Sequence, residues 1–336
     1  MSTLRDVALK ARVDVSTASK VLSGREIQVK DSTRRRIEAA ARSLGYTPNA
    51  YARGLRMQRK GAIAMVVWDT TNLVFPEIVE GAEEAAERLG IGLFLVRHTD
   101  VQRTDRLLSI IRQDRMDGWI FADHMPDEAF VSELRKAKIR YVTLDRIKAG
   151  PGPYVCLDDE AGFRVQAEQI VAQGHRKVAF VAVEPECYIT RLCRHSFLKS
   201  MAGHFLPLPP SHVLGADFVG RDAERLAETI VNLRPRPTAV ACGSMQTATR
   251  LIEALLARGI KVPEEIGVVG YHDPPNALVS RPPLTTVRMP SRAQGRIAVE
   301  RLVELVEGKR RRFDGEILDE APEFVVRGSL RLDQSG

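Results

Sequence analysis

Apolar residues recur along this chain with two different spacings, and the change falls near residue 60. Up to residue 46 they lie three or four positions apart in three short stretches, which is the spacing of amphipathic helices. The apolar positions are Leu4, Val7, Ala8 and Ala11, then Val15, Ala18, Val21 and Leu22, then Ile37, Ala40, Ala41 and Leu44. The pattern predicts three short helices that share one small core.

The residues around these stretches are typical of helix ends. Thr3 is followed three positions later by Asp6, as in a capping box, and Asp14 can cap the second helix after a break at residues 12–14. Gly45 is placed to stop the third helix as a left-handed C-cap. Two short helices joined by a three-residue turn indicate a helix-turn-helix, whose second helix enters the major groove of DNA.

Beyond Lys60 short apolar runs alternate with stretches of helical spacing. This alternation predicts parallel strands joined by helices, and it occurs twice, so we expect two doubly wound parallel sheets. The first series has strands at 62–68, 91–96, 118–122 and 141–144 and helices at 76–89, 102–114 and 127–137. The second has strands at 178–183, 239–242 and 267–271 and helices at 193–201, 223–233 and 246–258, followed by a helix at 291–307 and a strand at 324–327.

The net charge of +7 is concentrated at one end of the chain. Residues 1–60 hold 14 Lys and Arg against 5 Asp and Glu, whereas residues 61–336 hold 36 against 38. A basic module joined to a nearly neutral body indicates binding to a polyanion such as DNA. A basic solvated face would give a similar count, but it explains a segment with its own helical motif less well.

The first sixty residues contain short motifs in a fixed order. They are Leu4, Asp6-Val7-Ala8, Ala11, Val13, Ser16-Thr17-Ala18-Ser19-Lys20-Val21-Leu22, Thr33-Arg34 and the run from Leu44 to Leu55. Over its whole length this segment resembles the headpiece of the lactose-repressor (LacI/GalR) family of DNA-binding regulators. The resemblance implies DNA contacts at Thr3, Val15, Ser16, Thr17, Ser19, Lys20, Arg34, Tyr46, Asn49, Ala52, Arg53 and Leu55.

Each implied role has a physical basis and an alternative. Val15, Ser16 and Lys20 take the base-reading positions, where a lysine can donate to the acceptors of guanine. Lys20 could instead contact only a phosphate. Leu55 takes the position of a hinge leucine that wedges between base pairs in the minor groove, or it packs against its dimer mate.

Two residues of the turn depart from the family pattern. Arg12 stands where Gly or Asn is usual, and an arginine in the left-handed conformation costs about 1 kcal/mol. Asp14 replaces the usual serine cap and brings a negative charge close to DNA. We therefore expect a lowered affinity for DNA.

The resemblance continues through the body and covers essentially the whole chain. Its landmarks include Phe75-Pro76-Glu77, Asp158-Asp159-Glu160, Gly174-His175-Arg176-Lys177 and Leu284-Thr285-Thr286-Val287. They imply an all-α helix-turn-helix headpiece (1–47), a hinge helix or linker (48–60) and an α/β periplasmic-binding-protein-like body of two doubly wound parallel-sheet lobes. We expect the N-terminal lobe at 61–158 plus 290–320 and the C-terminal lobe at 159–289 plus 321–336.

The effector pocket is where the chain departs most from this family. Cys193 stands at a position where family members that bind sugars or purines usually have arginine, and His272 stands where they have an acid. We therefore expect ordinary sugars and purines to bind weakly, and His272 to make any response pH-dependent between about pH 5.5 and 7.5. The pocket residues predicted from the resemblance are Trp68, Phe75, Cys187, Cys193, Arg194, Phe218 and His272.

Three interpretations of that pocket stay open. It can accept an unusual, less polar ligand; it can be vestigial, so that no effector is needed; or Cys187, Cys193 and His272 can form a thiol- or soft-metal-sensing site. The last rests on weak evidence, because free cysteines are usually buried and inert.

Other classes of function are disfavoured. No catalytic motif is present, so no catalytic residue, cofactor or resident metal is expected, and a transport-type solute-binding protein would need a secretion signal and would lack residues 1–60. Apolar runs are too short for a membrane span, and four scattered cysteines give no disulfide framework. We expect a cytoplasmic homodimeric regulator, most simply a repressor, that binds a near-palindromic double-stranded DNA operator and a small-molecule effector.

Overall fold

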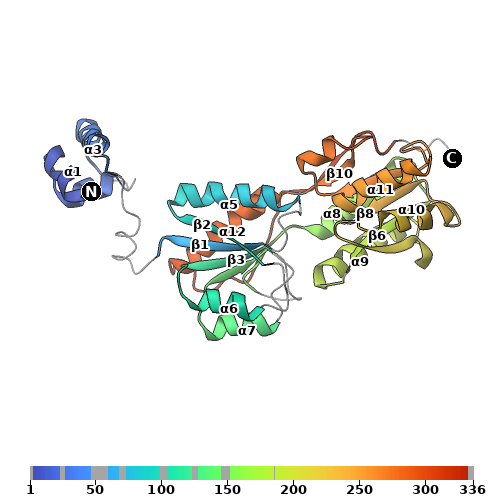
Figure 1. The fold of residues 1–336 in the computed structure, drawn as a ribbon, viewed down its shortest axis with the longest axis horizontal. Helices are drawn as coiled ribbons and strands as arrows, with labels where there is room; N and C mark the ends of the chain where they lie inside the picture. The colour runs from blue at the N-terminus through green and yellow to red at the C-terminus, as the bar shows by residue number, and fades with distance from the viewer. Residues whose placement is uncertain are drawn as a thin grey trace. The chain divides into compact units, whose positions relative to one another are not determined.

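A computed structural model of the chain describes residues 3–22, 27–46, 60–67, 73–98, 104–122, 128–144, 152–184 and 186–331. The chain divides into two compact units, Met1–Gly61 and Ala62–Gly336 (Figure 1). We call the first unit the headpiece and the second the body, and each is described by itself.

Three helices form the headpiece: α1 (Leu4–Ala11), α2 (Val15–Leu22) and α3 (Asp31–Ser43). The predicted capping box is present, since the Thr3 side chain accepts from the Asp6 N–H and Asp6 accepts from the Thr3 N–H. The core residues come from all three helices: Val7, Ala8, Ala11, Ala18, Val21, Ile37, Ala40 and Ala41. The Arg36 Nε donates to the Ala11 carbonyl over 2.7 Å, so α3 is also fastened to the end of α1.

The first lobe of the body is a four-stranded parallel sheet in the order β2-β1-β3-β4. Its elements are β1 (Ala62–Val67), α5 (Phe75–Leu89), β2 (Gly92–Arg97), α6 (Thr104–Arg112), β3 (Gly118–Ala122), α7 (Glu128–Lys136), β4 (Tyr141–Thr143) and α12 (Ser291–Val306). Alternate β1 side chains enter two different cores, with Ile63 and Met65 on one side and Ala64 and Val66 on the other. Helices α5 and α12 cover the first face, and α6 and α7 cover the second (Figure 1).

The second lobe is a six-stranded sheet in the order β12-β10-β9-β8-β6-β7. Its elements are α8 (Asp159–Ala172), β6 (Val178–Glu184), α9 (Tyr188–Gly203), the 3-10 turn η2 (Pro210–His212), β7 (Val213–Asp217), α10 (Ala223–Asn232), β8 (Ala239–Cys242), α11 (Met245–Ala257), β9 (Gly267–Tyr271), the 3-10 turn η3 (Pro275–Leu278), β10 (Thr285–Arg288) and β12 (Glu323–Val325). Residues of α8 and α9 join the core on one face, and residues of α10 and α11 form the core on the other.

Short segments connect the two lobes. Strand β5 (Val155–Cys156) pairs with β11 (Glu316–Ile317), outside both large sheets. From β10 the chain returns to the first lobe as α12, and from β11 it goes back to the second sheet as β12. Gln294 of α12 donates to the carbonyls of Leu144 and Val155 over 2.8 and 3.0 Å, which holds the first connection against the helix.

The predicted fold class is confirmed, with corrections at particular elements. Strand β12 runs antiparallel to β10, so the second sheet is not wholly parallel. Helix α9 begins at Tyr188, five residues before the predicted start at Cys193, because the pattern followed only its apolar half. Helix α8 and strands β7 and β10 were not predicted: α8 is buried on several sides and has no clear apolar stripe, and β7 is only half-buried.

The helices that the structure describes include none long and apolar enough to cross a membrane.

Candidate DNA-binding and effector-binding sites

Helix α2 presents the three predicted base-reading residues to solvent. Val15 is 44% exposed, and Ser16 and Lys20 are also exposed, whereas Ala18 and Val21 on the opposite side are buried in the headpiece core. Thr17 and Ser19 are half-buried at the borders of this surface. The exposed valine at the first turn of α2 therefore marks a surface that lies outside the headpiece core and that another molecule can reach.

The other predicted DNA contacts fall into two groups. Thr3 is exposed as the N-cap of α1, Arg34 is half-buried on α3, and Tyr46 packs against the headpiece core. Four lie outside the described residues: Asn49, Ala52, Arg53 and Leu55. The hinge wedge therefore stays a prediction.

The turn between α1 and α2 has the conformation expected from the sequence. Arg12 adopts φ 50° and ψ 52°, the left-handed region, and its N–H donates to carbonyls at the end of α1. The Asp14 carbonyl accepts from the backbone N–H groups of Thr17 and Ala18, each over 3.0 Å, and so opens α2. The arginine thus occupies a conformation that glycine or asparagine would adopt at lower cost.

The predicted effector residues lie mostly near one edge of the second sheet. Parallel strands β6, β7, β8 and β9 end at the same edge, where ligands of open α/β sheets bind. Phe218 follows β7 and His272 follows β9, and the Phe218 carbonyl accepts from Ser244 over 2.7 Å and from Thr247 over 3.3 Å. In the first lobe Phe75 is the first residue of α5 and is half-buried. Trp68 lies outside the described residues.

Helix α9 places the remaining predicted residues. Cys187 is its N-cap, and the Cys187 N–H donates to the Thr190 hydroxyl over 2.8 Å. Cys193 is half-buried against the main core, and Arg194 forms an ion pair with Glu186. The described residues contain no group of three His, Cys, Asp or Glu able to hold a metal ion, which leaves the metal-sensing interpretation without support.

Tyr271 is a buried residue that sequence reasoning did not single out for the site. Its hydroxyl donates to Asp159 Oδ1 over 2.9 Å, and burial, with Asp159 and Cys193 nearby, raises the pKa of this phenol well above its usual value. A Cβ on Gly162 would lie 2.2 Å from the Tyr271 hydroxyl oxygen. Glycine at 162 therefore lets α8 lie directly against the end of β9.

The expected pH response of His272 between pH 5.5 and 7.5 is wrong. His272 sits at φ 68°, edge-on to Tyr271 with ring centroids 4.9 Å apart, and its Nδ1 lies 3.5 Å from Ser291 Oγ. Burial of the imidazole disfavours its charged form and lowers the pKa of His272 to about 4. His272 is neutral throughout the range in which the sequence suggested a switch.

The strongest polar cluster is centred on the next residue, Asp273. Arg327 holds this buried carboxylate with two hydrogen bonds of 2.6 and 2.8 Å, and Arg288 adds two more, of 2.8 and 3.0 Å. Arg288 also pairs with Glu323 over 2.7 Å. The sequence carried one signal for this cluster: Asp273 is an acid directly beside the predicted pocket residue His272. The partners of Asp273 come from distant strands, so the sequence did not reveal them.

Two residues of the first lobe carry further polar groups, one in the first turn of α5 and one at the carboxyl end of β2. Glu77 of α5 is half-buried, and burial, then the nearby Asp273 and Glu80 carboxylates, raise the pKa of its carboxyl. His98 follows β2 and is buried, and neither of its ring nitrogens has a hydrogen-bond partner among the residues described. A buried imidazole without a partner is costly unless another group meets it.

Comparison with known proteins agrees with this architecture. Residues 3–49 match the model of bacterial regulatory proteins of the lacI family, and residues 167–330 match the periplasmic binding protein-like domain. The HTH-type transcriptional repressor PurR of Photobacterium profundum is 29% identical over 334 residues, covering 98% of this chain and 99% of the relative. PurR of Aliivibrio salmonicida is 27% identical, with 98% and 99% covered.

Solved structures give the same fold. The lac repressor dimer bound to operator and the anti-inducer ONPF superposes with a TM-score of 0.75 at 24% identity, covering 98% of this chain and 99% of that chain. A LacI family transcriptional regulator from Mycobacterium smegmatis gives a TM-score of 0.74 at 25% identity, covering 80% and 99%.

Fold, motifs and relatives together define a transcription regulator that combines a helix-turn-helix DNA-binding domain with an effector-binding type of α/β body. Its DNA-binding domain, residues 3–49, is of the lacI family of bacterial regulatory proteins, and residues 167–330 form a periplasmic binding protein-like domain.

Proposed function

We propose that this regulator represses transcription by occupying a near-palindromic operator as a homodimer, with α2 as its reading helix. The observation that carries the proposal is the exposed surface of Val15, Ser16 and Lys20 on a small domain with a strong excess of positive charge. Lys20 can donate to guanine and Val15 can contact a thymine methyl. The excess of basic residues supplies phosphate contacts that fix the register of α2.

An exposed apolar edge supports the homodimer. Strand β2 lies at the edge of the first sheet, with Phe94 and Leu95 each 50% exposed. Leu89 at the end of α5 is 41% exposed and Ile110 of α6 is 37% exposed. Large apolar side chains on and beside an edge strand favour association with a second copy, which would also bring two headpieces to two half-sites.

We infer that the effector binds at the carboxyl edges of the two sheets and is less polar than a simple sugar. Cys193 and the neutral His272 offer no permanent charge to it, Arg194 is paired with Glu186, and the acid Asp273 is already held by two arginines. The unpartnered imidazole of His98 provides one hydrogen-bonding group from the first lobe. In this proposal the protein acts in the cytoplasm, by binding rather than by catalysis. Its N-terminal lobe comprises residues 61–158 and 290–320, and its C-terminal lobe comprises residues 159–289 and 321–336.

The role of α2 as the reading helix is tested by substituting two lysines separately, one on α2 and one on α1. Lys20→Ala should weaken binding to an operator selected from genomic fragments by about 1–3 kcal/mol and relax the preference at one base pair per half-site. Lys10→Ala is the matched control, because Lys10 is an exposed lysine of the neighbouring helix α1. Fluorescence anisotropy on operator and random DNA separates the roles. Equal loss on both DNAs would make Lys20 a phosphate contact, and unchanged binding would remove α2 as the reader.

The effector site is tested by calorimetry of the full chain against hexoses, pentoses, nucleobases and uncharged aromatic or aliphatic metabolites. We expect the charged and hydroxyl-rich compounds to bind weakly, and any tight binder to lose affinity in Cys193→Ser and His98→Gln. Tight binding of an ordinary sugar that neither substitution changes would place the effector elsewhere.

A further inference from the structure

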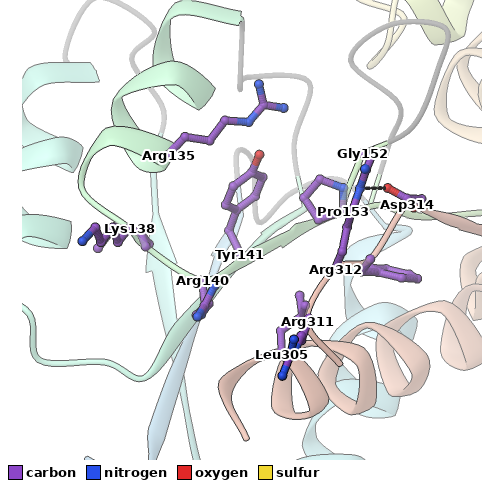
Figure 2. A pocket seen from close by; sticks show the side chains of 12 residues that line it. Arg135, Lys138, Arg140, Tyr141, Gly152, Pro153, Leu305, Arg311, Arg312 and Asp314 are labelled. Carbon is purple, nitrogen blue, oxygen red and sulfur yellow. Dashed lines mark ion pairs between the residues drawn. The ribbon is translucent and has the colours of Figure 1, made fainter. Parts of the chain in front are cut away.

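A concave site lies in the first lobe, lined by none of the predicted effector residues. It is a cavity of about 530 Å³, a size typical of small-molecule sites. Three segments line it: the end of α7 with the start of β4, residues 152–153, and the end of α12 with the loop that follows it (Figure 2).

Positive charge dominates this cavity. Its charged lining residues are Arg135, Lys138, Arg140, Arg311, Arg312 and Asp314, five cations against one carboxylate and a net of +4. Arg312 pairs with Asp314 over 2.5 Å, and Arg135 lies 3.8 Å from Glu128. Within the described part of the chain, Lys138, Arg140 and Arg311 form no ion pair. Like charges gathered in one cavity repel one another, so an anion that enters it relieves that repulsion.

The rest of the lining is suited to an organic group. Tyr141 is buried and packs edge-on against Phe121 with ring centroids 6.3 Å apart, and the positive charge of Arg135 lies near its hydroxyl. Figure 2 shows the Tyr141 ring between the arginines of the two walls, with Pro153 nearby. Leu305 and Phe313 complete an apolar part of the surface. A cavity with charged walls and an apolar base fits a molecule that has both kinds of surface.

We propose that this cavity binds a small organic molecule that carries two phosphate groups. Each phosphate brings about −1.5 to −2 charges at neutral pH, so two of them match the net charge of the lining. Arginine dominates the site, and its planar fork suits bidentate contacts with phosphate oxygens. A single phosphate would leave half of the positive charge unmatched, and a DNA backbone would favour an extended surface over a concave site of this size.

The position of the cavity gives the ligand a route to regulation. Arg140 directly precedes β4, and the Arg140 carbonyl accepts from the Trp119 N–H over 3.0 Å. The Asp117 N–H donates to the Ala62 carbonyl over 2.7 Å, so Arg140 lies at the same edge of the sheet as Ala62. Ala62 is the residue at which the body begins after the segment from the headpiece. A ligand here therefore acts close to the point where the body is joined to that segment, independently of the predicted effector.

Calorimetry of the full chain at physiological salt tests the proposal, with inorganic phosphate, inorganic pyrophosphate, ADP and adenosine as probes. We expect pyrophosphate and ADP to bind at least tenfold more tightly than phosphate, and adenosine not to bind. The double variant Arg140→Glu with Arg311→Glu should lose at least tenfold in affinity for both. Lys199→Glu with Arg221→Glu changes the net charge equally on exposed residues of the second lobe and should bind as the unmodified chain does.

A second pair of substitutions controls for folding, and three results would overturn the proposed site. Arg140→Gln with Arg311→Gln guards against misfolding, and it should reproduce the loss with an unchanged unfolding temperature without ligand. No binding of pyrophosphate, or equal loss in the cavity and control variants, would overturn the site. A cavity variant that loses operator affinity without any ligand, while pyrophosphate binding persists, would assign these arginines to DNA phosphates and equally overturn it.

Discussion

The headpiece and the second lobe of the body place their functional residues by opposite means. In the headpiece, the α1–α2 turn and the caps bind residues only a few positions apart, and the contact between Arg36 and Ala11 spans 25 positions. In the second lobe, Tyr271 reaches Asp159 across 112 positions and Arg327 reaches Asp273 across 54. The proposed reading helix α2 is therefore set by local sequence, whereas the residues predicted for the effector site come together only once distant strands have paired.

The largest effect should come from removing the centre of the long-range cluster. Asp273→Ala leaves Arg327, only 12% exposed, without its carboxylate, and should lower the free energy of unfolding by about 3–5 kcal/mol. Asp319→Ala is the control, an exposed acid whose loss should change little. Urea unfolding followed by tryptophan fluorescence gives both values. A loss below about 1 kcal/mol for Asp273→Ala would mean that the cluster contributes little to stability.

The next largest effect on stability should come from the close approach of Gly162 to Tyr271 in the second lobe. Gly162→Ala would place a Cβ 2.2 Å from the Tyr271 hydroxyl oxygen and should cost about 1–3 kcal/mol, because α8 must move away from β9. Gly203→Ala adds the same methyl at the end of α9, where the new Cβ would meet no atom of another part of the chain within 4 Å. Thermal unfolding of the two variants should differ accordingly, and equal melting temperatures would contradict the close packing.

His272 should make stability depend on acid pH. Its pKa is about 4 in the folded chain against an ordinary 6.5, so the unfolded chain takes up the proton first. Its contribution is complete above about pH 6.5, is lost as the pH drops toward and below 4, and amounts to about 3 kcal/mol. Glu77 acts with the opposite sign, because its raised pKa favours the folded state at low pH.

The His272 contribution is isolated by substitution. His272→Asn keeps a residue that tolerates a positive φ, and should reduce the loss of stability between pH 7 and pH 4.5. His195→Asn replaces an exposed histidine of α9 and should leave that loss unchanged. Identical pH profiles for His272→Asn and the unmodified chain would contradict the depressed pKa.

The smallest effect belongs to the headpiece and has the opposite direction. Arg12→Gly should stabilise it by about 1 kcal/mol, since glycine adopts φ 50° without strain. Arg12→Ala removes the same charge but keeps a Cβ, so it should bring no such gain. Hydrogen exchange of the α1 and α2 amides reports the change, and equal protection in the two variants would contradict a strained turn.

These contrasts also explain what could be read from the sequence. Helix α2 was predicted with its correct limits because Val15 to Leu22 follow a break and keep a helical spacing. Asp273 was passed over in favour of His272, because only the pairing of β10 with β9 and β12 brings Arg288 and Arg327 beside it. Burial, which lowers the pKa of His272, is likewise a property of the assembled lobe. The basic cavity joins residues 135–141 and 152–153 with 305–314, and no periodic pattern connects those segments.

The threefold crossing of the chain between the lobes has a consequence for how the body can be cut or rebuilt. Residues 157–158, 289–290 and 318–322 each carry the chain from one lobe to the other. A single proteolytic nick in one of them leaves two covalent links, so the nicked body should remain a single particle in solution. Neither lobe can be expressed as one uninterrupted fragment. A functional split reporter built from this protein would need its break inside a lobe, at a surface loop, rather than between the lobes.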